Sequence, residues 1–245
     1  MIFAGRLEAE DFTWNGTLQP GGVLTIRAVR GDIVAEPSQS GRIEVVGRKK
    51  GSREDLGAVN VRVIEEAGTV TICTSQPGND RCPGGKDQRQ DKKKNDARID
   101  FTVRIPAGVQ LVADTEIGKV EALSLTSPID ARTVMGNIEI STSAYARAES
   151  INGDIRATMG KTDWSGSLKF ETVNGNILVR LPTDANTELQ ATSMTGNFES
   201  DLFPVQKTPY GARIPGADVS GTLGKGGRKL KITTTNGSIR LERAS

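Results

Sequence analysis

A glycine-centred pattern recurs along this chain and limits what the chain can fold into. Each copy has a glycine, a residue that is usually Asp or Asn, and then an apolar residue, as in VMGNIEI, INGDIRA and VNGNILV. The glycines are Gly31, Gly118, Gly136, Gly153, Gly175, Gly196 and Gly237, and the apolar residues are Ile33, Val120, Ile138, Ile155, Ile177, Phe198 and Ile239. From Gly118 to Gly196 the copies are 18, 17, 22 and 21 residues apart. A period near twenty is typical of a solenoid whose coils stack.

Each position of the pattern has a physical role. Glycine permits a sharp corner or a close approach of the next coil's backbone. Asp or Asn beside it can bond the local backbone, and the apolar residue points inward by the two-residue period of a strand. A single Asn-Gly pair would instead predict a hairpin, so a sandwich of hairpins is the structural alternative. Seven copies at long spacing favour the solenoid.

The part of the chain before the repeats reads as longer alternating strands, in the runs VLTIRAV, RIEVVGR, VNVRVIEE and TVTICTS. No long linker follows them, so we expect one all-β solenoid domain over residues 1–245. Residues 1–98 would hold the longer strands and a basic, Cys-bracketed loop, and residues 99–245 the repeat stack. The stretch 204–227 is rich in Pro and Gly and is predicted to be a loop that covers one edge.

The two cysteines, Cys73 and Cys82, bracket a strong turn signal at residues 77–79. A disulfide between them would contribute about 2–3 kcal/mol and would indicate an oxidising compartment; two free thiols are the alternative. The segment from Met1 to Arg6 is too short for a signal peptide. We therefore expect an exported mature chain, periplasmic, cell-surface or secreted, whose signal peptide has been removed, with a cytoplasmic protein as the alternative.

Composition excludes several kinds of chemistry. The chain has no histidine, which removes the commonest general base and metal ligand. Its net charge of +2 argues against a nucleic-acid partner, and it has no apolar run long enough for a transmembrane segment. We expect no enzymatic activity, no cofactor and no bound metal. Asp114, Glu116 and Asp130 are carboxylates of the kind that glycosidases use, but no pattern sets their separation.

Candidate ligand contacts lie in the basic loop between the cysteines and the repeat stack, namely Lys86, Arg89, Lys92, Lys93 and Lys94. Such a loop could bind an anionic polymer. Three aspartates interrupt it, so a simply solvated loop is the alternative. A second cluster, Lys225, Arg228, Lys229 and Lys231, could extend the surface. Trp14, Trp164 and Tyr210 are candidates for stacking on sugars, although single aromatic residues of β proteins more often belong to the core.

The segments RAVRGDIVAE, FTVRIPAGVQL, VMGNIEI, INGDIRA, VNGNILV and TTTNGSIRLE together resemble the bacterial putative-adhesin family, β-strand-repeat domains of largely unknown function. The resemblance covers nearly the whole chain. It implies a right-handed β-helix-like solenoid, exported or displayed on the envelope, and it brings no catalytic residues. The predicted function is a non-enzymatic binding or adhesion module for an envelope or host polysaccharide or a protein partner, acting through its stacked β surface and loops.

Two other functions stay open. A β-helix carbohydrate enzyme, a lyase or a glycosidase, can work without histidine by using Lys or Arg beside carboxylates. An envelope-stress sensor would pass a signal to a membrane partner. The sequence leaves the ligand and the oligomeric state open, although unpaired strand edges at the ends of a solenoid permit end-to-end association.

Overall fold

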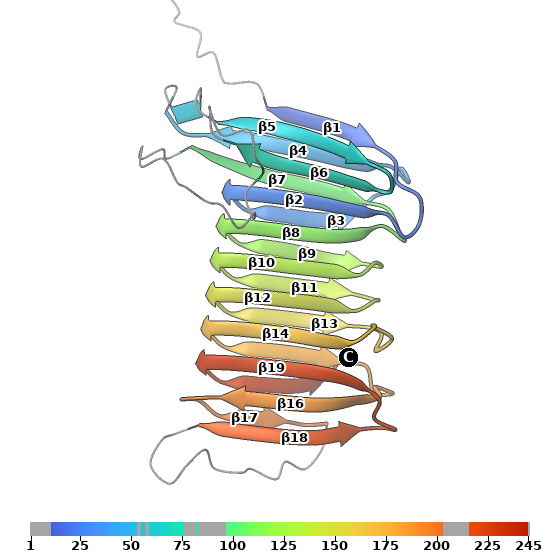
Figure 1. The fold of residues 1–245 in the computed structure, drawn as a ribbon, viewed down its shortest axis with the longest axis vertical. Helices are drawn as coiled ribbons and strands as arrows, with labels where there is room; N and C mark the ends of the chain where they lie inside the picture. Colours follow the sequence, from blue (N-terminus) through green and yellow to red (C-terminus); the bar gives the residue numbers. More distant parts are fainter. Residues whose placement is uncertain are drawn as a thin grey trace, which may run out of the picture.

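The computed structural model describes residues 11–52, 55–56, 59–75, 82, 97–202 and 216–244. Within these residues, twenty strands form two ten-stranded sheets, seen as one tall stack in Figure 1. Sheet A contains, in spatial order, β1 (Phe12–Gly16), β4 (Ile43–Lys50), β7 (Arg98–Ile105), β3 (Ile33–Pro37), β9 (Val120–Leu125), β11 (Ile138–Thr142), β13 (Ile155–Met159), β15 (Ile177–Leu181), β20 (Ile239–Arg243) and β17 (Phe198–Ser200). Sheet B contains β18 (Ala217–Leu223), β16 (Thr187–Ser193), β19 (Arg228–Asn236), β14 (Ser167–Asn174), β12 (Ala146–Asn152), β10 (Ile129–Met135), β8 (Gln110–Ile117), β2 (Val23–Arg30), β6 (Thr69–Ser75) and β5 (Asn60–Glu66).

The middle of the stack consists of parallel coils, each with one strand in either sheet. Strands β8, β10, β12 and β14 follow one another in sheet B, and β9, β11, β13 and β15 follow one another in sheet A. Ile138 of β11 pairs with Val120 of β9 on one side and with Ile155 of β13 on the other. The prediction of an all-β, solenoid-like fold is confirmed. The parallel pairing excludes a sandwich of Asn-Gly hairpins, whose neighbouring strands would be antiparallel.

The core lies between the two sheets, because alternate residues of every coil point inward. Ile138, Ile155 and Ile177 are each no more than 1% exposed, and they lie one above the other on adjacent parallel strands. One hydrophobic cluster extends from Leu24 to Leu241. Full burial of each such side chain is worth about 1.5–3 kcal/mol. Among the residues described, no helix is long and apolar enough to span a membrane.

Antiparallel strands lie at both ends of the parallel stack. β1 and β4 are antiparallel at one end of sheet A, and β5 and β6 at the same end of sheet B. The indole Nε1 of Trp14 in β1 donates to Glu65 Oε1 in β5 at 3.1 Å, so the two outermost strands are joined across the sheets. At the opposite end of sheet B, β18 pairs antiparallel with β16.

The prediction of a loop throughout residues 204–227 is wrong for its second part, because residues 217–223 form β18. In this strand Ala217, Val219 and Leu223 point into the core, so the segment contributes apolar side chains as the other strands do. Gly221 stands at the inward position between Val219 and Leu223, and this hid the alternation in the sequence. Residues 203–215 lie outside the described ranges.

The spatial order of the last coils differs from their order in the chain. In sheet B, β19 pairs with β14 on one side and with β16 on the other. In sheet A, β20 lies between β15 and β17. The C-terminal coil is therefore inserted between two coils that are consecutive in sequence, and Figure 1 shows the red β19 between β14 and the orange β16.

Candidate functional site

The corners of the coils are held rigidly by contacts between glycines of neighbouring coils. A Cβ added to Gly153 would lie 1.8 Å from the carbonyl oxygen of Gly136, and one added to Gly175 would lie 2.1 Å from that of Gly153. No side chain fits there, so the corners approach at backbone distance. Gly237 contacts Gly175 in the same way, and Gly196 contacts Gly237. The corner glycines are therefore stacked in the same order as the strands, with the C-terminal coil between its two neighbours.

A ladder of buried hydroxyl groups supports these corners, and we did not predict it from the sequence. Each hydroxyl donates to the carbonyl oxygen of a corner glycine in the adjacent coil; the Thr172 Oγ1 to Gly153 O distance, for example, is 3.0 Å. The donors are Thr115, Thr133, Ser150, Thr172, Ser193 and Thr234. All six stand three residues before a glycine of the pattern. A Ser/Thr-x-x-Gly signal could therefore have predicted the ladder.

The Asp and Asn residues that follow the glycines are used for bonds between coils. Asp154 N–H donates to Asn137 Oδ1 at 2.9 Å, and Asn176 N–H donates to Asp154 Oδ1 at 2.8 Å. The side-chain oxygen therefore accepts a hydrogen bond from the backbone of the next coil, whereas we expected it to bond the local backbone. Among the residues described, no three His, Cys, Asp or Glu side chains gather in a way that could hold a metal ion.

The outer face of sheet B carries a network of ion pairs in its middle. Arg132 lies 3.0 Å from Asp130 Oδ2 and 3.7 Å from Glu149 Oε2, and Arg147 lies 3.8 Å from Asp130 Oδ2. Lys169 and Glu171, both on β14, form a further ion pair. Opposite charges therefore compensate one another from β10 to β14.

This network includes Asp130, one of the three carboxylates that we singled out as glycosidase candidates, and a second one, Asp114, lies beside it. Asp114 lies opposite Arg132 on the neighbouring strand, and Asp130 lies opposite Val112. Burial raises the pKa of Asp114 and of Asp130, while the nearby Arg132 lowers the pKa of both. Glu116 stands further along β8, two residues beyond Asp114.

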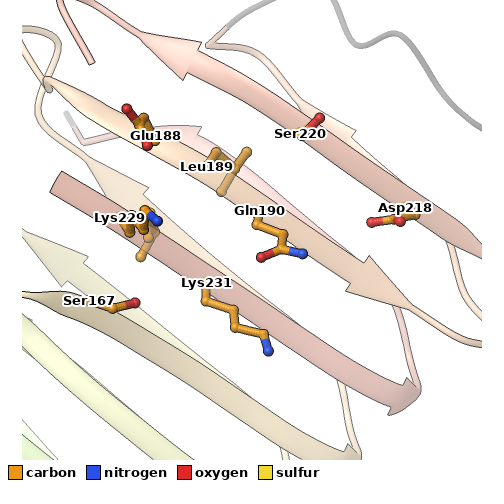
Figure 2. A pocket seen from close by; sticks show the side chains of 9 residues that line it. Ser167, Glu188, Leu189, Gln190, Asp218, Ser220, Lys229 and Lys231 are labelled. Atoms are coloured by element: carbon orange, nitrogen blue, oxygen red, sulfur yellow. The ribbon is translucent and has the colours of Figure 1, made fainter. Parts of the chain in front are cut away.

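Beyond the network, at the end of the stack that holds β18, the same face has a depression of about 420 Å³. Figure 2 shows its lining on four strands: Ser167 from β14, Lys229 and Lys231 from β19, Glu188 and Gln190 from β16, and Asp218 and Ser220 from β18. Gln190 lies between Lys231 on one neighbouring strand and Ser220 on the other. Ammonium, amide, hydroxyl and carboxylate groups thus surround one hollow.

The four charged groups of this depression are kept apart. Lys229 lies opposite Glu188 in the strand register, yet neither of the two forms an ion pair within 4.0 Å with any described residue. Lys231 and Asp218 also form none with any residue that the structure describes. Asp218 accepts one hydrogen bond, from Thr192 Oγ1 at 3.2 Å. The groups therefore remain available to a ligand, in contrast to the paired charges of the neighbouring network.

A second depression, of about 380 Å³, lies at the turns that precede β14, β16 and β19. Its lining includes Lys161, Thr162, Asp163, Asp184 and Arg228. Like the first depression, it presents both donors and acceptors. The predicted cluster of Lys225, Arg228, Lys229 and Lys231 is accordingly divided, since Lys229 and Lys231 face the first depression and Arg228 faces the second.

The aromatic candidates are parts of the framework. Trp164 is 1% exposed, and its Nε1 donates to the carbonyl oxygen of Lys229 at 3.2 Å. Its own carbonyl oxygen accepts a hydrogen bond from Arg228 Nε. Trp164 thereby joins the turn before β14 to the start of β19. Trp14 is half-buried, and Tyr210 lies outside the described residues.

The predicted disulfide between Cys73 and Cys82 is confirmed, with a Cα–Cα distance of 5.5 Å. It starts from β6 in sheet B, at the end of the stack that holds β5. The predicted basic contacts Lys86, Arg89, Lys92, Lys93 and Lys94 lie outside the described residues.

Comparison with known proteins gives one family and several similar folds. The model of the family described as Toastrack DUF4097 matches residues 103–242. A putative cell adhesion protein from Clostridium sporogenes, known from its crystal structure, is 12% identical over 96% of this chain and 100% of its own, with a TM-score of 0.50. A putative adhesin from Bacteroides fragilis is 13% identical over 95% of this chain and 97% of its own, with a TM-score of 0.40. No curated protein matches the chain. At such identities the likeness is one of fold alone.

Proposed function

Since the chain belongs to the Toastrack DUF4097 family, and so bears out its resemblance to bacterial putative adhesins, we propose that it is a non-enzymatic binding module that recognises a glycan. The ligand would lie on the outer face of sheet B, in the depression between Lys229, Lys231, Glu188 and Asp218. The observation that carries the proposal is that these four charged groups surround one hollow without an ion pair to any residue that the structure describes, beside a network whose charges are paired.

The chemistry of the lining supports a glycan. Sugar hydroxyl groups both donate and accept hydrogen bonds, and the lining offers donors in Lys229, Lys231 and the Gln190 amide and acceptors in Glu188 and Asp218. Hydrogen bonds to charged groups are the stronger kind, worth about 1.5–3 kcal/mol. Because the two positive and two negative charges compensate each other, recognition would depend on hydrogen bonding more than on net charge, and it would persist in salt.

Rigidity of the face also supports this role. The strands that carry the lining belong to the same stack as the closely packed glycine corners and the hydroxyl ladder, so the backbone of the site needs no rearrangement on binding. A site on strands of a rigid scaffold keeps its polar groups in place. The hollow is within the size range of small-molecule sites.

An exported location is part of the proposal. The Cys73–Cys82 disulfide supports it, because such bonds persist in oxidising compartments. The fold is also that of a putative cell adhesion protein, and adhesion takes place outside the cytoplasm. We also propose that residues 1–245 form one domain, because one hydrophobic cluster extends from Leu24 to Leu241, and that the coil is right-handed, as crossovers between parallel strands of one sheet almost always are.

We propose a structural role for Asp114 and Asp130, in place of the glycosidase role. Asp130 contacts two guanidinium groups, and Asp114 faces Arg132, so both carboxylates contribute to pairing across strands. An assay for released reducing or unsaturated sugar, run with every polysaccharide that binds, tests this. Release of sugar by the wild type that stops in Asp114→Asn or Asp130→Asn would establish the enzymatic alternative.

The proposed function is tested by binding to an array of bacterial and host polysaccharides in low and in high salt. We expect at least one polysaccharide to bind in both, and the double variant Lys231→Ala, Gln190→Ala to weaken that binding at least about tenfold. A matched control is Arg48→Ala with Thr102→Ala, on the outer side of sheet A. Absence of salt-resistant binding, or equal losses in both double variants, would refute the proposal.

A further inference from the structure

The two depressions lie one after the other along the same three strands. β14, β19 and β16 are adjacent and parallel, so their starting ends share one edge of sheet B. The first depression lies over the first residues of these strands, such as Ser167, Lys229 and Gln190. The second lies at the turns just before them, at residues 160–163, 182–186 and 226–228. An extended molecule that follows the strand direction from the edge onto the face would pass from the second depression into the first.

The distance suits a chain of a few sugars. Asp184 in the second depression and Gln190 in the first are six positions apart on the segment that enters β16. At about 3.3 Å per extended residue, the two hollows are separated by at most about 20 Å. A short oligosaccharide is therefore long enough to reach both hollows.

The second depression also has polar groups ready for a ligand. Lys161, Asp163 and Asp184 form no ion pair within 4.0 Å among the described residues. Two positive side chains, Lys161 and Arg228, balance the two carboxylates. A site for a phosphate or another anion would not place two carboxylates at the ligand, so the balance favours an uncharged, hydroxyl-bearing unit.

The turns that line the second depression are held in one arrangement. Trp164 joins the turn before β14 to the start of β19 through its Nε1 and its carbonyl oxygen. Asn186, just before β16, accepts from Lys225 N–H at 2.7 Å and donates to the carbonyl oxygen of Asp184 at 2.8 Å. All three turns that line the second depression are therefore fixed relative to the strands that line the first.

From this placement we infer that the two depressions are successive subsites for one linear oligosaccharide, which runs along the strands and crosses the edge of sheet B. The inference rests on the proposed glycan-binding function. The ligand class is a polysaccharide recognised as an extended segment of several sugars. The second depression adds affinity only to oligomers long enough to reach it.

The test uses oligomers of two to eight sugars prepared from the polysaccharide with the strongest signal on the array, titrated by calorimetry against the full chain. For the wild type we expect affinity to rise with length until both subsites are filled. In the double variant Asp163→Ala, Asp184→Ala, the long oligomers should lose about tenfold or more, while the shortest keep their affinity. In Lys231→Ala, Gln190→Ala every length should weaken.

Controls separate this inference from the function on which it rests. Glu66→Ala with Glu139→Ala removes the same charge from exposed positions elsewhere, and it should leave all lengths unchanged. Asp163 and Asp184 are themselves exposed, so equal unfolding midpoints are expected for their double variant. If the Asp variant affects no length, or all lengths equally, the second subsite is refuted while glycan binding stands. If no oligomer responds to either site variant, both proposals fail.

Discussion

Replacing Gly153 by alanine tests the idea that the coils approach at backbone distance at their corners. An alanine Cβ would lie 1.8 Å from the carbonyl oxygen of Gly136 and 2.5 Å from its carbonyl carbon. Contacts of a real Cβ are essentially never shorter than 3.0 Å. The two corners would therefore have to separate by at least about 1 Å. Because the obstacle is backbone of the neighbouring coil, no side-chain rotation can relieve it.

The cost follows from the hydrogen bonds that such a separation would break. At this corner Gly136 N–H donates to Asn152 O at 3.0 Å, and Ile138 N–H donates to Asp154 O at 2.9 Å. Two side-chain bonds join the same coils, from Asp154 N–H to Asn137 Oδ1 at 2.9 Å and from Ser150 Oγ to Gly136 O at 3.3 Å. At about 1 kcal/mol for each bond, Gly153→Ala should lower the free energy of unfolding by about 4 kcal/mol.

The assay is equilibrium unfolding in urea, followed by far-ultraviolet circular dichroism and by fluorescence of the buried Trp164. Gly166→Ala is the matched control, because a Cβ there would have nothing within 4 Å although the backbone φ is +71°. Its cost should be only the local backbone strain, about 1–2 kcal/mol. If Gly153→Ala loses no more stability than Gly166→Ala, the close approach of the corners is not what requires glycine, and the reasoning is wrong.

Three further predictions concern stability. Thr172→Val leaves the Gly153 carbonyl oxygen without its buried hydroxyl donor, so we expect a loss of about 1–2 kcal/mol in urea unfolding, against little change for Thr158→Val on the outer side of β13. Reduction of the Cys73–Cys82 bond should cost about 2–3 kcal/mol, measured by unfolding with and without a thiol reductant; an unchanged midpoint would contradict this. Burial raises the pKa of Asp114 in the folded chain, so the stability linked to its protonation is present below the ordinary value of 3.8 and is lost as pH rises through the raised folded value. The stability of the wild type relative to Asp114→Asn should therefore fall as pH rises above 3.8, and a flat or rising difference would refute the assignment.

The inward-facing side chains and the disulfide were accessible from the sequence because both depend on local chemistry. An apolar residue two positions after a glycine points to the core in each coil, as Ile138, Ile155 and Ile177 do, because strand periodicity alone decides it. The cysteines lie nine positions apart on either side of a strong turn signal, so their pairing also follows from nearby residues. β18 was missed because Gly and Pro dominate the stretch around it.

The candidate site could not be read from the sequence, because it is assembled from distant segments. Lys229 and Lys231 were singled out together, but Glu188, Gln190 and Asp218 were not, and no spacing along the chain connects them. They meet because β19 enters the stack between β14 and β16 and so brings its lysines beside residues about forty positions earlier. The second depression depends on the same insertion, through Arg228.

The sequence alone therefore determines the single coil: which side chains of each strand point inward, where the chain turns, and which cysteines can meet. The tertiary structure decides which coil lies on which. From Gly118 onward, every coil presents its neighbours with the same row of backbone donors and acceptors, the same corner glycine and a hydroxyl group three residues before it, so Gly175 could receive the coil of Gly196 as well as that of Gly237. The pattern that makes the coils stack cannot specify their order. That order comes from the packing of the whole C-terminal part, including the antiparallel pairing of β18 with β16, and it creates the surface on which we place the ligand.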